Sequence, residues 1–273
     1  MTIDREDQLD GLKRIGLIVG RTLEAMRGAA QPGMTTAELD AIGAKLLELE
    51  GARSAPQLAY NFPGATCISV FPAIAHGIPG SEVLRAGQLV NIDVSAEKDG
   101  YFADTGASFV LHAKDAALDA LCRDGKRALW TGIRAVKTGG ALNAPGIAIE
   151  EFARKNRYTL IRNLASHGVG GALHEEPGEI PTWRDMSERR RIHEGLVFTL
   201  EPFLSRGASW AVDGKAAGGG GAAGGDHSTV GEDGARAVVV VFRGAIGRGA
   251  ADQQGQRGQE EKTEEQHGKN DER

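Results

Sequence analysis

Two aspartates in the stretch VNIDVSAEKDGYFADTG, residues 90–106, have the residue type and the surroundings of a cation site. Asp93 stands between an isoleucine and a valine, and Asp104 follows eleven residues later. A carboxylate among apolar side chains is costly unless a partner compensates its charge. The simpler alternative is a solvated hairpin whose acids are ordinary surface residues.

The register of the hairpin decides how close these two carboxylates come. A turn centred between Lys98 and Asp99 places Asp93 directly opposite Asp104, with both side chains on one face of the ladder. Two like charges at that separation are unstable unless one is protonated or a cation bridges them. We therefore expect the pair to bind a divalent metal. A turn centred on Asp99-Gly100 would need a bulge on each side to keep this pairing.

Other residues with metal-binding chemistry occur in two further segments. The glycine-rich segment LASHGVGGALHEEPGEIP carries His167 and His174, and the apolar segment GLVFTLEPFL carries Glu201. A single histidine is more often structural than a ligand, but Glu201 repeats the anomaly of Asp93. Mixed oxygen and nitrogen donors suit Mn, Fe, Co or Zn better than Ca or Mg. Bridging carboxylates suit a two-metal centre that activates water near neutral pH.

The elements that must position these residues follow from periodicity and turn signals. Apolar residues at three- and four-residue intervals predict helices, and Thr35-Thr36-Ala37-Glu38 is a capping box that opens the second of them. Helix, helix and strands therefore occur in this order twice, which predicts an α+β fold of two related halves, with helices on one face of a largely antiparallel sheet. We expect helices over 4–29, 35–50, 115–138 and 144–156, and strands within 66–70, 88–111, 158–165 and 195–204.

Composition limits the class of protein. The chain has 273 residues, a net charge of −5 and two cysteines. The near balance of charge argues against a nucleic-acid surface, and no apolar stretch approaches the length of a membrane span. The charged N-terminus predicts no secretory signal, and two cysteines make no disulfide framework. We expect a cytoplasmic protein that binds neither membrane nor nucleic acid.

Five segments in order resemble the successive motifs of type I methionine aminopeptidases. The resemblance runs from about residue 7 to about residue 213. It implies the pita-bread fold, in which two pseudo-symmetric helix-helix-strand halves surround an antiparallel sheet. It also implies a hydrolase that removes the initiator methionine from nascent polypeptides. The segments are YNFPGATCIS, AHGIPG, VNIDVSAEKDGYFADTGASF, SHGVGGALHEEP and LVFTLEPFL.

The resemblance also implies a role for individual residues. It makes Asp93, Asp104, His167 and Glu201 ligands of two divalent metal ions (Co, Mn, Fe or Zn), with Asp104 shared by both ions and Glu201 also taking the proton of the attacking water. His76 matches the histidine near the scissile amide, and His174 the one that stabilises the tetrahedral intermediate. The segments resembling the methionine pocket contribute Phe62, Cys67 and Trp183. For Cys67, a small buried apolar residue is an equally good interpretation.

The C-terminal quarter departs from the family pattern. We expect a catalytic domain over 1–213, an atypical glycine-rich remnant of the last strands over 214–246, including a strand within 235–244, and a disordered tail over 247–273. The family's fifth ligand, a glutamate in a strand, has no convincing counterpart; Asp226 and Glu232 are weak candidates. A reading frame shifted after about residue 214 explains the abrupt change, and a divergent tail is the alternative.

Three functions are therefore compared. The first is an active two-metal methionine aminopeptidase, and the second is a catalytically inactive pita-bread protein that binds a peptide or partner. An Xaa-Pro peptidase is disfavoured because that group carries an extra N-terminal domain for which this chain has no room. For the first function, the expected partners are the N-termini of nascent polypeptides; a ribosome contact stays open, and we expect a monomer.

Overall fold

The computed structural model describes residues 1–214, 227–230 and 239–246. Its helices are α1 (Glu6–Ala29), α2 (Thr36–Leu49), α3 (Ala55–Tyr60), α4 (Ala116–Ala135) and α5 (Ala144–Lys155). Its strands are β1 (Arg53–Ser54), β2 (Cys67–Val70), β3 (Ala73–Ala75), β4 (Leu89–Lys98), β5 (Tyr101–Val110), β6 (Thr159–Leu160), β7 (Ser166–Gly168), β8 (Glu175–Ile180), β9 (Phe198–Leu200), β10 (Phe203–Ser205), β11 (Ala211–Gly214), β12 (His227–Val230) and β13 (Val239–Ile246). None of the helices in these ranges is both apolar enough and long enough to span a bilayer.

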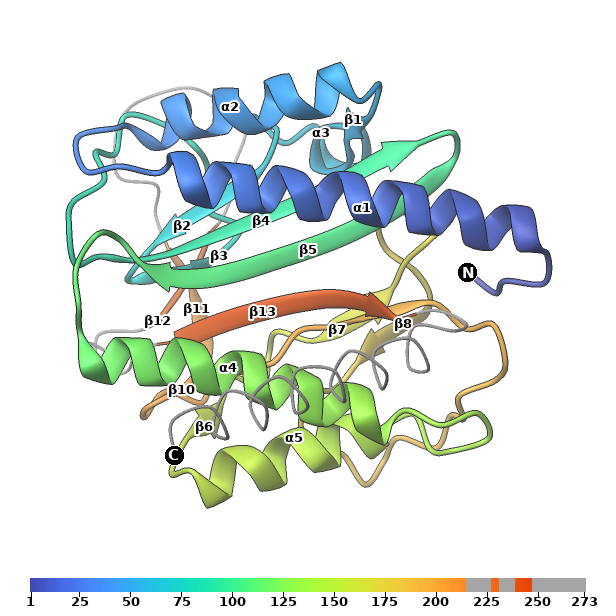
Figure 1. Cartoon of the computed structure of the whole chain (residues 1–273). Coiled ribbons are helices and arrows are strands. Elements are labelled where there is room, and N and C mark those ends of the chain that lie inside the picture. The colour runs from blue at the N-terminus through green and yellow to red at the C-terminus, as the bar shows by residue number, and fades with distance from the viewer. Residues whose placement is uncertain (215–226, 231–238, 247–273) are drawn as a thin grey trace, which may run out of the picture.

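The fold consists of an antiparallel sheet and two pairs of helices, each pair beside its own part of the sheet, as Figure 1 shows. Its main path runs β1-β4-β5-β13-β9-β7-β8, and β2, β6 and β10 pair at its sides. Helices α1 and α2 lie together beside β4 and β5, and α4 and α5 lie together on the other side of β13. The helix-helix-strand order expected from the sequence is therefore confirmed, and β13 joins the two halves through its pairing with β5 and β9.

The N-terminal half is built on the apolar face of α1. Ile15, Val19 and Met26 lie on this face and are almost completely buried, which removes apolar area from water. Helix α2 begins at the predicted capping box, where the Thr35 hydroxyl accepts the backbone N–H of Glu38 and the Glu38 carboxylate accepts the N–H of Thr35. The buried residues of this half form one apolar cluster with β2, β4 and β5.

The hairpin of β4 and β5 corrects the register expected from the sequence. Its turn is the two-residue Asp99-Gly100 turn, with φ of +55° and +84°, which suits the twist of the flanking strands. Asp93 therefore pairs with Gly106, and Asp104 pairs with Ser95, without the bulges that a direct pairing requires. The prediction that the two aspartates lie directly opposite is wrong. Because the register shifts by two residues on each strand, both side chains still occupy one face and are diagonal neighbours.

The C-terminal half interrupts the long strand predicted over 195–204. Pro202 has no backbone N–H to donate to a ladder, and the structure breaks at Glu201-Pro202 into β9 and β10. The strand predicted over 158–165 is reduced to β6. Helix α4 begins after Asp115, whose carboxylate accepts the N–H groups of Ala117 and Leu118.

Several elements were not expected from the sequence. Helix α3 is only six residues long, and β3 joins β11 and β12 in a separate three-stranded sheet. The strand expected within 235–244 is present as β13, shifted toward higher residue numbers. The predicted tail at 247–273 lies outside the described residues, as do both weak candidates for a fifth ligand, Asp226 and Glu232.

Candidate metal centre

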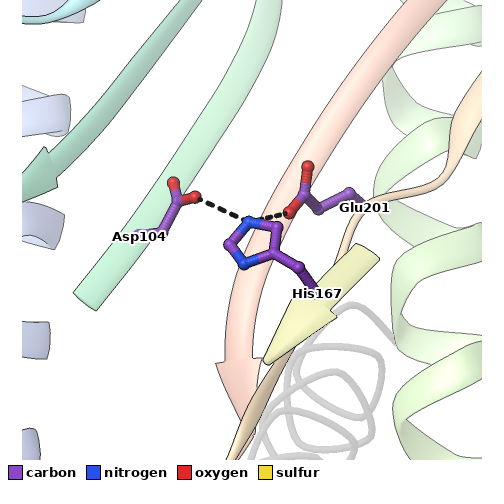
Figure 2. Close-up of side chains that lie close together, drawn as sticks. All are labelled: Asp104, His167 and Glu201. Carbon is purple, nitrogen blue, oxygen red and sulfur yellow. Dashed lines mark ion pairs between the residues drawn. The ribbon is translucent and has the colours of Figure 1, made fainter. Parts of the chain in front are cut away.

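Three side chains from separate parts of the sheet meet at one point. Asp104 comes from β5, His167 from β7, and Glu201 from the break after β9, as Figure 2 shows. The Nε2 atom of His167 lies 3.0 Å from Oε1 of Glu201 and 3.5 Å from Oδ2 of Asp104. All three residues are buried, and one ligand atom from each lies within 4.8 Å of the others. Two carboxylates and an imidazole in this arrangement are a donor set for a divalent cation.

The ring of His167 is oriented by its own backbone. Its Nδ1 lies 3.0 Å from the carbonyl oxygen of Gly168. Because a carbonyl can only accept, Nδ1 carries a proton, and Nε2 faces the two carboxylates, where it binds either a second proton or a metal ion. Metal-binding histidines are commonly held in this way by a hydrogen bond to their second ring nitrogen.

The electrostatics of the cluster favour a positive charge. Burial alone would lower the pKa of His167, but its hydrogen bonds and charge interactions with Asp104 and Glu201 outweigh that effect and raise the pKa to about 10. A proton on the imidazole and a cation between the three side chains are therefore two ways of compensating the same negative charge. The residues present fit a divalent metal.

A buried threonine and serine hold the cluster in place. The hydroxyl of Thr199 donates to Oε1 of Glu201 at 2.6 Å and accepts the backbone N–H of His167 at 3.0 Å. The hydroxyl of Ser166 accepts the backbone N–H of Glu201 at 2.9 Å. Two potential ligands, His167 and Glu201, are thereby connected through side chains with no exposed surface.

Asp93 lies beside this cluster rather than inside it. It is buried on β4, on the same face as Asp104, and both aspartates line one cavity with His167 and Glu201. It is not part of the group whose ligand atoms lie within 4.8 Å of one another. The four predicted ligands thus reach one cavity, with Asp93 on the side of Asp104 that is away from β13.

The cavity has a volume of about 420 Å³ and contains most of the predicted site residues. His76 and His174 line it together with Phe62 and Cys67. Trp183 does not line it; this residue packs against the apolar cluster of α4, α5 and β6. The remaining lining residues are Pro56, Tyr60, Ser95, Asn163, Leu164, Ala165, Ser166, Leu173, Glu179 and Phe203.

The two cavity histidines are held differently. His76 has a φ of +55°, an unusual backbone conformation for a residue with a Cβ, and the adjacent Gly77 packs so closely on β2 that a Cβ there would collide with the Ile68 carbonyl. His174 lies against the metal cluster, its ring centroid 3.9 Å from that of His167.

Sequence reasoning missed three residues of this site. Tyr60 lies in the segment YNFPGATCIS together with the predicted residues Phe62 and Cys67, and its hydroxyl hydrogen-bonds His174. Thr199 lies two residues before Glu201, where alternation along a strand places both side chains on one face. Glu179 pairs with His167 across β7 and β8. The position of Glu179 in the cavity depends on the pairing of β7 with β8, which the sequence alone does not indicate.

The residue expected as a fifth ligand stays a prediction. The strand between β5 and β9 is β13, whose sequence VVVFRGAI contains no aspartate or glutamate. In the part of the chain that the structure describes, the carboxylates that line the cavity are those of Asp93, Asp104, Glu179 and Glu201, and those of Asp104 and Glu201 belong to the cluster with His167.

Comparisons with known proteins agree on one family. The model of metallopeptidase family M24 matches residues 10–233. A methionine aminopeptidase of Staphylococcus epidermidis is 44% identical over 216 residues, which cover 79% of this chain and 86% of that protein. Methionine aminopeptidase 2 of Bacillus subtilis is 44% identical over 214 residues, covering 78% and 86%.

The structural comparison supports the same assignment. The crystal structure of methionine aminopeptidase from Rickettsia prowazekii is similar with a TM-score of 0.81 and 27% sequence identity, over 90% of this chain and 96% of that one. The predicted α+β pita-bread architecture of two helix-helix-strand halves is confirmed.

Proposed function

Because the chain belongs to metallopeptidase family M24, and within it to the methionine aminopeptidases, we propose that it hydrolyses the first peptide bond of polypeptides that begin with methionine. The observation that carries this proposal is the buried cluster of Asp104, His167 and Glu201 on the wall of a cavity that also holds two further histidines. The substrates are the N-termini of nascent polypeptides.

The cavity provides surroundings for both ends of a methionine residue. Phe62, Cys67, Leu173 and Phe203 supply apolar surface for the thioether side chain, because thioethers pack well against aromatic rings and small apolar groups. The metal centre proposed below lies on the wall of the same cavity, and the free α-amino group of the substrate would bind near one of its metal ions through its lone pair. A requirement for a free amino terminus follows from this contact.

We infer that the centre binds two divalent ions of the Mn, Fe, Co or Zn class. Asp104, His167 and Glu201 would hold the first ion, and Asp93 with Asp104 the second. The first set has one more donor and an imidazole, so the first ion binds more tightly. When bound, the metal supplies polarisation of the scissile carbonyl and activation of a water molecule.

The side chains of the chain itself move the protons. Glu201 accepts a proton from the attacking water and transfers it to the leaving amine, as a carboxylate at the reacting centre can. His174 donates a hydrogen bond to the oxygen that becomes negatively charged, which stabilises the transition state more than the substrate. His76, which also lines the cavity, would contact the amide of the scissile bond.

Release of methionine from a short peptide tests this function. Purified protein is stripped with EDTA, loaded with Co or Mn, and incubated with a Met-Ala-Ser peptide; free methionine is measured. The same peptide acetylated at its N-terminus is the control and should not be cleaved. Peptide and metal binding without methionine release at any metal concentration would instead support an inactive peptide-binding protein.

The setting of the reaction is proposed on the same basis. We infer that the protein works as a monomer in the cytoplasm, where nascent chains become accessible as they leave the ribosome. Light scattering after gel filtration measures the first point, and co-sedimentation with ribosomes measures a direct ribosome contact. If the protein is absent from the ribosome pellet at both low and high salt, it meets its substrates in solution.

A further inference from the structure

The hydroxyl of Tyr60 is in direct contact with His174. The phenolic oxygen lies 2.5 Å from Nδ1 of His174, and the two rings meet at 58° with centroids 5.5 Å apart. Tyr60 and His174 are separated by 114 positions in the chain, so the contact exists only because the fold brings α3 to the loop before β8.

The local structure around Tyr60 fixes the backbone from which this hydroxyl projects, although the side chain itself is 59% exposed. Tyr60 is the last residue of α3, which begins with Ser54 accepting the N–H of Gln57 and with a proline in its first turn. The C-cap residue that follows the helix is Asn61, which has a left-handed φ of +53°. Asparagine tolerates this conformation better than most residues. A short helix with defined ends at both sides therefore presents the phenol to the cavity.

The chemistry of the two groups determines which one donates. Desolvation raises the pKa of Tyr60, so the phenol keeps its proton at neutral pH. A neutral imidazole has one donor and one acceptor nitrogen. If the Tyr60 O–H donates to Nδ1, that nitrogen is the acceptor, and the hydrogen of His174 is on Nε2.

We propose that Tyr60 is a positioning residue that holds His174 as the Nε2–H tautomer, with its donor directed to the reacting carbonyl. This inference rests on the proposed function and adds to it a residue that acts through another. The His174 ring is held from two sides, by the phenol of Tyr60 and by the ring of His167, whose centroid is 3.9 Å away. A donor fixed before the substrate arrives stabilises developing negative charge without reorganisation.

Kinetics of Tyr60→Phe in the Mn-loaded enzyme provide the first test. This change removes the hydroxyl and keeps the ring, so the pocket surface stays. We expect kcat to fall by about tenfold to a hundredfold, because part of one donor's contribution is lost, with KM changed less than about twofold. Tyr158→Phe is the matched control, since its hydroxyl donates to Asp124 at 3.0 Å between α4 and β6; kcat should be unchanged. An unchanged kcat in Tyr60→Phe, or a loss that appears only in KM, would overturn the proposal.

A double-mutant cycle separates positioning from pocket lining. If Tyr60 acts through His174, the Tyr60→Phe change costs nothing further in a His174→Ala background, since coupled residues are not additive. If Tyr60→Phe lowers kcat by the same factor in both backgrounds, the hydroxyl acts on the substrate by itself, which contradicts the proposal.

A readout without turnover distinguishes this inference from the proposed function. In ¹⁵N-histidine-labelled protein, the ring nitrogens of His174 should show a protonated Nε2 and an unprotonated Nδ1 in the wild type and in Tyr158→Phe, and a mixture of tautomers in Tyr60→Phe. An Nδ1–H tautomer in the wild type would refute the positioning role. If the wild type shows the expected tautomer but releases no methionine, the proposed function fails while the tautomer assignment stands.

Discussion

Thr199 connects directly to Glu201, with 2.6 Å between the threonine hydroxyl and Oε1 of the carboxylate. The same hydroxyl accepts the backbone N–H of His167, so one buried side chain hydrogen-bonds two potential ligands from different parts of the sheet. Replacing residues that hold metal ligands in this way typically lowers metal affinity by about tenfold to a hundredfold.

Replacing Thr199 by valine should weaken both the fold and the metal centre. The variant keeps the shape but leaves a buried N–H of His167 without its acceptor, which costs about 1–3 kcal/mol. We expect a lower free energy of unfolding in denaturant titrations and a metal affinity reduced by about tenfold to a hundredfold in calorimetry. Thr199→Ser retains the hydroxyl and is the control. Equal metal affinity in the valine and serine variants would contradict the role of this hydroxyl.

Gly168 permits the close approach of β7 and β8 beside His167. A Cβ at this position would collide with the carbonyl oxygens of Glu175 and Glu176. Gly168→Ala should therefore destabilise the protein by about 1–3 kcal/mol and displace His167, lowering metal affinity. At Gly171 a Cβ would meet only the flexible end of the Glu175 side chain, so Gly171→Ala should leave the midpoint of thermal unfolding within a few degrees of the wild type. Similar effects of both changes would show that backbone crowding at Gly168 is tolerated.

Metal binding and stability should depend on pH through His167. In the metal-free protein its pKa is raised from 6.5 to about 10, so its protonation stabilises the fold fully below about pH 6.5, and this stability is lost as pH rises toward about 10. Metal binding must displace that proton, so apparent metal affinity should increase by about tenfold per pH unit across the same window. Calorimetric titration with metal between about pH 6.5 and pH 10 measures the affinity, and thermal unfolding in EDTA over the same range measures the stability. In His167→Gln both dependences should shrink; their persistence would assign the titration to another group.

Replacing the proposed metal ligands should affect the two metal ions differently. Asp104→Asn and His167→Ala should lower the affinity for the first ion by more than about tenfold, since each removes one of three donors. Asp93→Asn should leave the first ion in place and weaken only the second, because Asp93 lies outside the three-residue cluster. Titration with Mn followed by mass spectrometry of the native protein counts the ions. Loss of the first ion in Asp93→Asn would reverse this assignment.

The sequence contains enough information to predict the local elements and the chemistry of the site. Apolar periodicity identified α1, α4 and α5, and the capping box identified the start of α2, because these signals depend on residues close together in the chain. The anomaly of an acid in an apolar strand drew attention to Asp93 and Glu201, because a buried charge requires compensation, and the hairpin pairing drew attention to Asp104. Four of the predicted pocket and catalytic residues, namely Phe62, Cys67, His76 and His174, line the cavity.

What the sequence could not predict depends on register and on long-range contacts. The sequence is compatible both with a turn at Asp99-Gly100 and with one centred between Lys98 and Asp99. The observed register is the former, and it keeps Asp93 and Asp104 on one face while moving them from opposite to diagonal positions. Helix α3 is too short to show periodicity, so the contact of Tyr60 with His174 was not visible. Trp183 was assigned to the pocket by resemblance, and the packing of α5 places it elsewhere.

The division of the core has a consequence for how the chain folds. The largest apolar cluster of the N-terminal half contains only residues between Ile15 and Leu111, so this half can collapse while the rest of the chain is still being synthesised. The metal centre needs β7 and the end of β9 in addition, and contacts between distant segments form slowly. Assembly of the centre is therefore a late event, and the first half of the chain can be compact before any of its carboxylates has the imidazole partner that the second half supplies.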